Sequence, residues 1–477
     1  MPLKPDRLER LGKYHLDWKE ISKVSLAISI ILVAPFVFGS PIIIPIALFL
    51  LVTGTYFVLS DFSIPIHHFL FLLIGLAILT PPIEFSSSLP AVRFEEIIIY
   101  MFFPLILILN YGQLSLSKPA RAFIKIYCAF ILFAVISTFY GYFALNVPPS
   151  VRDLFEIITY LKYLLIFLTL HTFRIEPKRI TPILYFILIT IMISGAFGIL
   201  QYFGVFNLDS ITGPYYLQDR IHLINNRLTA TYKNPNTYSA ILVTGHLIAL
   251  GLFFYEDRRK QKTLLLFSIA LLAVFILFAA SRTMIAAYLL VTVIMILIGA
   301  SKAGYSKLQI ISLITVLGIS FLIAVSFISY RIIVRLESGL DIFSDESFAM
   351  RILAWYLNLQ LFFQSPILGW GAAKAIHTTV VDNEFILILR RYGIIGLTIF
   401  AGIYLQPMFT AFKNLKSDSK LIFLFTSIIL TTIITFILAG LTNTLFHNMQ
   451  VMDFWFVLLS LYFIVTGSTK YSETDDT

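Results

Sequence analysis

The side chains best suited to chemistry in this chain are arginines that interrupt long apolar stretches. They are Arg227, Arg282, Arg331, Arg335 and Arg351. A guanidinium group binds phosphate through charge-assisted hydrogen bonds. An arginine near membrane depth costs about 2.5–3.5 kcal/mol on insertion scales. We therefore expect these arginines to face an anionic ligand. The alternative for Arg282 is that its side chain extends to lipid head groups at the interface.

Composition indicates what kind of protein positions these arginines. The 477 residues are 58% hydrophobic and 13% charged, with a mean hydropathy of +0.89, whereas soluble domains are about 25% charged. These values exclude an ordinary soluble domain and predict an all-α polytopic membrane protein. The net charge of +9 fits basic cytoplasmic loops, so we expect no nucleic-acid partner. The single cysteine, Cys128, excludes an intrachain disulfide.

Apolar runs bounded by polar residues, glycine or proline predict about 12–14 transmembrane helices. They lie near 24–38, 41–59, 64–80, 97–112, 122–145, 155–171, 180–204, 236–255, 263–280, 283–299, 308–328, 384–411, 421–441 and 450–467. The basic segment 1–23 lacks a signal-peptide cleavage pattern, so we expect the first run to be retained.

Strict alternation from a cytoplasmic N-terminus gives the topology. It places about 21 of the 35 Lys and Arg residues inside, as the positive-inside rule expects, and it predicts that both termini are cytoplasmic. The segments 205–235 and 329–383 then form large external loops. We expect three parts: N-terminal helices in 1–189, a core with these loops in 190–412, and C-terminal helices in 413–477.

The external loops have their own structural signals. Asn234-Pro235-Asn236 predicts a turn that starts the next helix, whose N-terminus suits phosphate. The alternative for 205–235 is a capped interfacial loop with a belt of aromatic residues. In the second loop, Phe348 to Gln364 predicts a short interfacial helix, and Ser365-Pro366 is expected to stop it.

An acidic and amide cluster follows at the mouth of the next apolar run. It consists of Asp382, Asn383 and Glu384, and His377 precedes it by five residues. Carboxylate and imidazole groups at such a place can act as general bases. The alternative for Asp382 is that it caps the next helix.

Four segments resemble, in order and sidedness, the O-antigen polymerase/ligase family of bacterial C-type membrane glycosyltransferases. They are RLTATYKNPN (Arg227 to Asn236), SRT (Ser281 to Thr283), R-xxx-W followed by PILGWG (Arg351 to Gly371), and DNEF-x6-YGIIGL (Asp382 to Leu397). The resemblance covers roughly 190–410, whereas the first six spans match only in hydropathy. Two positions depart from the family: Ala230 stands where members often have Gly, and Asp382 where ligases have His. The second departure favours a polymerase over a ligase.

The resemblance implies an undecaprenyl-diphosphate-linked glycan as donor and a glycan acceptor on the outer face of the bacterial cytoplasmic (inner) membrane. It implies no nucleotide sugar, no cofactor and no catalytic metal. The partners we expect are membrane lipids, a chain-length regulator and a flippase.

The resemblance also implies roles for individual residues. We expect the five arginines to hold diphosphate, and Asp382 to act as base, with His377 and Glu384 behind it. The residues expected to contact glycan are Tyr215, Tyr216, Trp355, Trp370, Asn236 and Asn383.

Two rival functions stay open. A ligase would transfer the glycan to another lipid or to protein. A transporter or lipid flippase would have charges inside its spans and pseudo-symmetric halves. The sequence argues against this second rival, because the mid-span charges are few, Lys125 and Lys162 being the clearest, and no interrupted repeat is visible.

Overall fold

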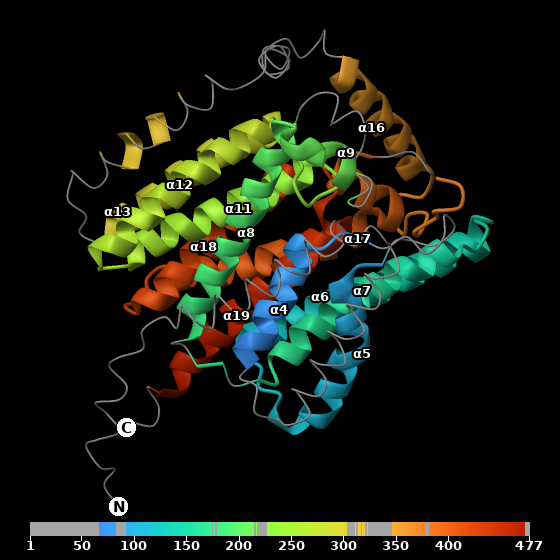
Figure 1. The fold of residues 1–477 in the computed structure, drawn as a ribbon. Helices are drawn as coiled ribbons and strands as arrows, with labels where there is room; N and C mark the ends of the chain where they lie inside the picture. Colours follow the sequence, from blue (N-terminus) through green and yellow to red (C-terminus); the bar gives the residue numbers. More distant parts are fainter. Residues whose placement is uncertain are drawn as a thin grey trace, which may run out of the picture.

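A computed structural model describes residues 66–82, 92–173, 175–176, 179–213, 216, 227–302, 311, 313–315, 317–319, 322, 346–377 and 381–472 (Figure 1). Its longer helices are α4 (Ile66–Leu79), α5 (Phe94–Leu109), α6 (Lys118–Ala144), α7 (Val151–Leu170), α8 (Ile180–Tyr202), α11 (Pro235–Tyr255), α12 (Arg259–Ala279), α13 (Arg282–Lys302), α16 (Glu346–Gln364), α17 (Glu384–Asn414), α18 (Lys420–Gly440) and α19 (Met449–Ser472). Short helices η1 (Tyr111–Gln113), η3 (Val205–Asn207), α9 (Leu208–Thr212) and η4 (Leu445–His447) lie between them.

Eight of the described helices are long and apolar enough to cross a membrane: α6, α8, α11, α12, α13, α17, α18 and α19. The prediction of a multi-pass α-helical membrane protein is therefore confirmed. The predicted runs 24–38 and 41–59, and most of 308–328, lie outside the described residues.

Local capping chemistry determines where several helices begin. The Asn234 side chain accepts a hydrogen bond from the Asn236 N–H, and Pro235 occupies the first turn of α11, as the sequence predicts. Helix α6 begins at Lys118, four residues before the predicted run, because Ser117 accepts from Ala120 N and so caps the basic first turn.

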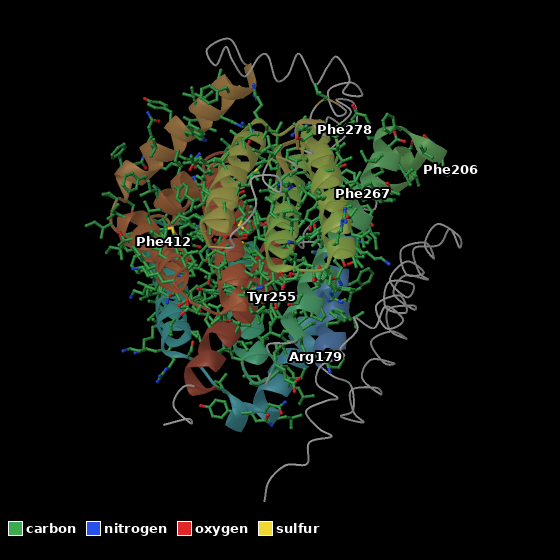
Figure 2. The ribbon with its side chains drawn as sticks, turned by 90° about the vertical axis from the view of Figure 1, so that its left-hand side faces the viewer. Arg179, Phe206, Tyr255, Phe267, Phe278 and Phe412 are labelled. Carbon is green, nitrogen blue, oxygen red and sulfur yellow. The ribbon has the colours of Figure 1, made fainter. Side chains whose placement is uncertain are left out.

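Consecutive helices alternate in direction, so one end of the bundle collects the loops that carry the motifs. We call this the loop end; it comprises the C-terminal ends of α4, α6, α8, α12 and α18 and the N-terminal ends of α5, α7, α11, α13, α17 and α19. Long-range hydrogen bonds hold these ends together, for example from Tyr216 Oη to Leu79 O at 2.8 Å and from Leu228 N to Phe278 O at 3.1 Å. Figure 2 shows Phe278 near one end of the bundle and Arg179 near the other.

Helix α11 forms the centre of the packing, and α6 and α13 form part of its periphery. Of the apolar window of α11, 94% is buried, compared with 39% for α6 and for α13. Outward side chains such as Phe267 of α12, which is 60% exposed (Figure 2), provide apolar surface for lipid.

Helix α7 differs from the eight apolar helices because it carries Arg152, Asp153, Glu156 and Lys162. Lys162 Nζ pairs with Glu96 Oε1 of α5 at 2.6 Å and with Asp453 Oδ2 of α19 at 2.9 Å. Nearby, Arg93 pairs with Glu95. We call Arg93, Glu95, Glu96, Lys162 and Asp453 the carboxylate–lysine network. Lys125, in contrast, is exposed on α6.

Candidate active site

The first two motif segments meet through Arg227. Its Nε atom donates to the carbonyl oxygen of Ala279 at 3.1 Å, two residues before the SRT segment. Its Nη2 atom donates to Asn236 Oδ1 at 2.8 Å, in the first turn of α11. The buried guanidinium also borders a cavity of about 270 Å³ that Gln201 and Asp209 line as well. Among the described residues that line the cavity, Arg227 is the cation and Asp209 is the carboxylate.

The chain between α18 and α19 links the SRT segment to the DNEF segment. Thr442 Oγ1 donates to Thr283 Oγ1 at 2.9 Å, and Asn383 Nδ2 donates to the neighbouring Leu441 O at 3.0 Å. Arg282 is the first residue of α13 and is half-buried. It lies at the tip of a turn between two long helices, where the sequence predicts it.

Arg351 and Asp382 join the third and fourth motif segments. Arg351 Nε lies 3.4 Å from Asp382 Oδ2, and the two side chains are 19% and 44% exposed. The alternative in which Asp382 caps the next helix is wrong. Asn383 occupies the cap position, because its Oδ1 accepts from Phe385 N and Ile386 N at 3.0 Å each, which leaves Asp382 directed to the arginine.

The PILGWG turn packs against the first turns of α17. Trp370 N donates to Arg390 O at 3.0 Å, and Gly371 N donates to Arg391 O at 2.7 Å. These carbonyl groups are available because Gly393 breaks the helical conformation at φ 60° and ψ −166°, a region that only glycine adopts readily. The turn thereby sets the positions of Arg390 and Arg391.

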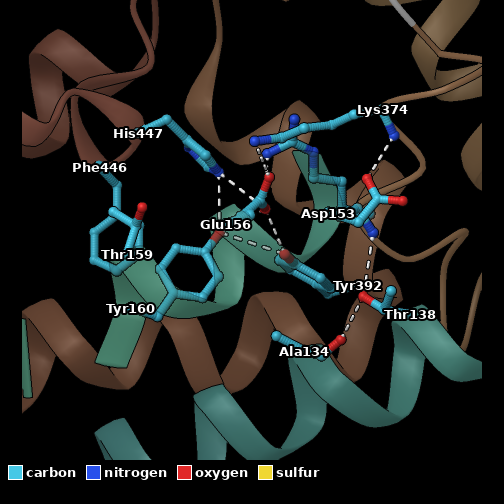
Figure 3. Close-up of polar contacts among 12 residues, drawn as sticks. Ala134, Thr138, Asp153, Glu156, Thr159, Tyr160, Lys374, Tyr392, Phe446 and His447 are labelled. Atoms are coloured by element: carbon cyan, nitrogen blue, oxygen red, sulfur yellow. Dashed lines mark hydrogen bonds and ion pairs between the residues drawn. The ribbon is translucent and has the colours of Figure 1, made fainter. Parts of the chain in front are cut away.

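A buried carboxylate, Glu156 of α7, organises most of the polar contacts beneath this turn (Figure 3). Its Oε1 accepts from Tyr160 Oη at 2.7 Å, Tyr392 Oη at 2.6 Å and Arg391 Nη1 at 2.9 Å. Its Oε2 lies 2.9 Å from Lys374 Nζ. Two cations and two phenols therefore stabilise one carboxylate that is 2% exposed.

A carboxylate–imidazole pair extends this arrangement toward η4. Glu384 Oε1 lies 2.7 Å from His447 Nδ1, and Glu384 Oε2 accepts from Phe446 N at 2.8 Å. His447 Nε2 lies 3.1 Å from Tyr160 Oη. On the other side, Asp153 Oδ1 accepts from the backbone N–H of Lys374 at 2.9 Å. We call the whole set the polar centre: Asp153, Glu156, Tyr160, Lys374, Glu384, Arg391, Tyr392 and His447.

The pKa values of the two histidines near the site are shifted in opposite directions. Burial lowers the pKa of His447, but the charge of Glu384 and hydrogen bonds to Glu156 and Glu384 outweigh it, so its pKa is raised above the usual value. Burial, together with the charge of Arg390, lowers the pKa of His377 to about 4. His447 therefore holds a proton more readily than His377 does.

The three candidate bases are not equally accessible. Both oxygens of Glu384 already accept hydrogen bonds, and its residue is 2% exposed. His377 stacks edge-to-face on Trp370, with 4.9 Å between ring centroids. The Asp382 side chain is 44% exposed, and among the described residues its ionic partner is Arg351. A substrate can therefore reach Asp382 without dismantling the polar centre.

The aromatic residues expected to contact glycan have varied surroundings. Tyr216 is buried at 3% exposure and bonds to α4. Trp370 Nε1 donates to Leu361 O at 2.8 Å, which holds the ring against α16. Trp355 is half-buried on α16 and packs edge-to-face against Phe348. Arg331, Arg335 and Tyr215 lie outside the described residues.

Sequence reasoning did not assign a role to Glu156, Lys374, Arg391 or His447. Glu156 lies inside a run that was assigned as apolar, and its ionic partners follow it by more than 200 residues. One local signal existed: Glu156 and Tyr160 are four residues apart, so they share a helix face. Nothing local points to Arg391 as a partner.

Among the residues that the structure describes, no three His, Cys, Asp or Glu side chains form a group that could hold a metal ion. In comparisons with known proteins, the chain matches no family model and no curated protein.

Proposed function

We propose that this protein is a membrane glycosyltransferase that polymerises undecaprenyl-diphosphate-linked repeat units at the outer face of the bacterial cytoplasmic membrane. The resemblance of its four motifs to the O-antigen polymerase/ligase family motivates the proposal. One observation carries it: the four segments, which are spread over 227–397, are tied to one another at a single end of the bundle.

The chemistry of that end suits transfer from a lipid diphosphate. Arg227, Arg282 and Arg351 would each provide charge-assisted hydrogen bonds, worth about 1.5–3 kcal/mol apiece. They would hold the donor and stabilise the departing diphosphate. Asp382 would accept the proton of the acceptor hydroxyl while that oxygen attacks the anomeric carbon of the donor.

Arg351 has a second role in this scheme. In the structure it pairs with Asp382, and a diphosphate would compete for the same guanidinium. Donor binding would then release the Asp382 carboxylate to act as base. The polar centre would position the segment that carries these residues and would not touch substrate.

Ala230 supports the assignment of the first motif. The family often has Gly at this position, and Ala230 adopts φ 50°, in the left-handed region that Gly tolerates best. The backbone conformation is therefore the one that the family residue favours, although the side chain differs.

Arg282 gives the decisive test. Arg282→Ala should abolish polymer in cells and leave single lipid-linked repeats, because the diphosphate loses a ligand. Arg259→Ala is the matched control, since Arg259 is also the first residue of a helix but lies at the opposite end of the bundle. Normal polymer from Arg282→Ala, or equal loss from both variants, would contradict the proposal.

A ligase is the nearest alternative, and deletion strains separate the two. A strain without a polymerase carries one repeat on its final acceptor. A strain without a ligase accumulates polymer on undecaprenyl diphosphate. Gel electrophoresis of the extracted glycans distinguishes these outcomes.

A transporter or flippase gains support from one observation. The carboxylate–lysine network places buried charges among helices, as proton-coupled carriers do. From the sequence we expected few such charges. Purified protein in vesicles that elongates lipid-linked repeats without nucleotide or metal would exclude the carrier. Movement of lipid-linked sugar across the vesicle membrane without elongation would favour it.

A further inference from the structure

The carboxylate–lysine network lies apart from the polar centre, and its charges do not balance. Three carboxylates, Glu95, Glu96 and Asp453, face two cations, Arg93 and Lys162, and all five residues are buried. With every group ionised, the network has a net charge of −1. An unbalanced charge in a low-dielectric interior costs far more than a neutral acid.

Among the described residues, the elements packed around the network bring no further cation to it. The other titratable side chains that face it, among the described residues, are tyrosines from α5, α6, α7 and the segment before α11, whose phenols are neutral at pH 7. They are Tyr100, Tyr127, Tyr163, Tyr216 and Tyr232.

The hydrogen bonds indicate which carboxylates carry the surplus negative charge. Glu96 is fully engaged, because Oε1 accepts from Lys162 Nζ at 2.6 Å and Oε2 accepts from the Arg93 backbone N–H at 2.9 Å. Glu95 Oε2 and Asp453 Oδ1, in contrast, are buried and accept no hydrogen bond. An anionic oxygen buried without a donor is costly. The surplus charge and the unsatisfied oxygens therefore coincide at Glu95 and Asp453.

We propose that the carboxylate–lysine network is a proton-binding site that holds one exchangeable proton on the carboxyl group of Asp453 or Glu95. Binding takes one proton from water and forms one O–H bond, which brings the network to zero net charge. Release returns that proton to water. A metal ion fits less well, since the described residues contain no group of three metal-binding side chains and the Lys162 ammonium lies between Glu96 and Asp453.

Such a site links proton concentration to helix packing. Arg93, Glu95 and Glu96 belong to the start of α5, Lys162 to α7 and Asp453 to α19. Loss of the proton at high pH restores the surplus negative charge and weakens the contact among these three helices. This coupling does not depend on the reaction that the loop end performs.

Infrared difference spectroscopy on the purified full chain tests the proposal directly. Spectra are recorded while the buffer is switched between acid and alkaline pH. We expect a buried carboxylic-acid carbonyl band at neutral pH that disappears in alkali. Separate labelling with ¹³C-aspartate and ¹³C-glutamate assigns it, because one label must shift the band. Absence of the band at neutral pH, or a band that neither label shifts, would overturn the proposal.

Substitutions give a second test. Asp453→Asn and Glu95→Gln each leave two carboxylates against two cations, so both variants should lose the band. Glu156→Gln, in the polar centre, should keep it. Persistence of the band in either network variant would overturn the proposal. If a variant does not fold, the isotope experiment on the unsubstituted chain still decides, since it needs no substitution.

Discussion

Helix α7 carries two buried charge clusters on different faces, and they balance their charges differently. Glu156 points into the polar centre, whereas Lys162, six residues later, points into the carboxylate–lysine network. At 100° per residue these positions are well separated around the helix. The polar centre has three carboxylates and three cations when His447 is protonated. The network has three carboxylates and two cations.

The difference shows two ways of keeping charge inside a helical bundle. The polar centre collects its cations from distant segments, namely Lys374 between α16 and α17, Arg391 of α17 and His447 of η4. The network takes its charged groups from α5, with the preceding Arg93, and from α7 and α19, and the described residues supply it with two cations. The first cluster therefore depends on the loop structure, and the second depends on a proton.

Neutralising one carboxylate in each cluster should give the largest difference between the two clusters in the free energy of unfolding. Glu156→Gln leaves Arg391 and Lys374 without their carboxylate, so we expect a loss of about 3–5 kcal/mol in the free energy of unfolding. Asp453→Asn keeps the network at zero net charge without a bound proton, so it should cost less than about 1 kcal/mol. Unfolding by denaturant in detergent measures both. Equal losses would contradict the difference in charge balance.

Substitution of Gly393, where the backbone of α17 bends, tests how far the stability of the polar centre depends on the PILGWG turn. A Cβ at this position would lie 2.2 Å from Ile367 O, and the conformation itself costs about 1–3 kcal/mol for other residues. Gly393→Ala should therefore destabilise the protein by at least that amount, in the same unfolding measurement. Gly112→Ala is the control, since nothing lies within 4 Å of its Cβ. The carboxylic-acid band of the network should survive Gly393→Ala.

The pH dependence of stability should contain one contribution from each cluster. The pKa of His447 is raised in the folded state by Glu384 and Glu156 despite burial. Its stabilisation is therefore complete below the unfolded-state pKa of about 6.5 and is lost as the pH rises through the folded-state pKa. In an Asp453→Asn background, thermal unfolding from mildly acid to alkaline pH should retain this decrease. Addition of His447→Gln should remove it; an unchanged profile would show that His447 is not the titrating group.

The exposed pair between Arg351 and Asp382 should show the smallest effect on stability. Partly solvated ion pairs contribute about 0–1 kcal/mol, so Arg351→Gln should hardly change unfolding. Polymer formation should nevertheless fall sharply if Arg351 holds the donor diphosphate. Loss of stability comparable to that of Glu156→Gln would instead make Arg351 a structural residue.

Helix starts and ends that depend on residues close in sequence could be predicted. The Asn234-Pro235-Asn236 turn begins α11, and Ser365-Pro366 follows the last residue of α16. The short reversal before Arg282 also agrees with the predicted hairpin tip. Caps and breaks act within three or four residues, so the sequence contains all the necessary information. The alternative in which Asp382 caps α17 was wrong by one residue, because Asn383 occupies the cap position.

The buried charge partners could not be predicted in this way. The sequence by itself determined a multi-pass helical protein, the starts of several helices such as α11 and α17, and the polar segments that interrupt it. Only the tertiary structure decided that Glu156 meets Arg391, 235 positions away, and that Lys162 meets Asp453, 291 positions away. The physical reason is that hydropathy specifies which segments are apolar but not which helix faces meet. An ion pair forms only where packing brings two faces within about 4 Å.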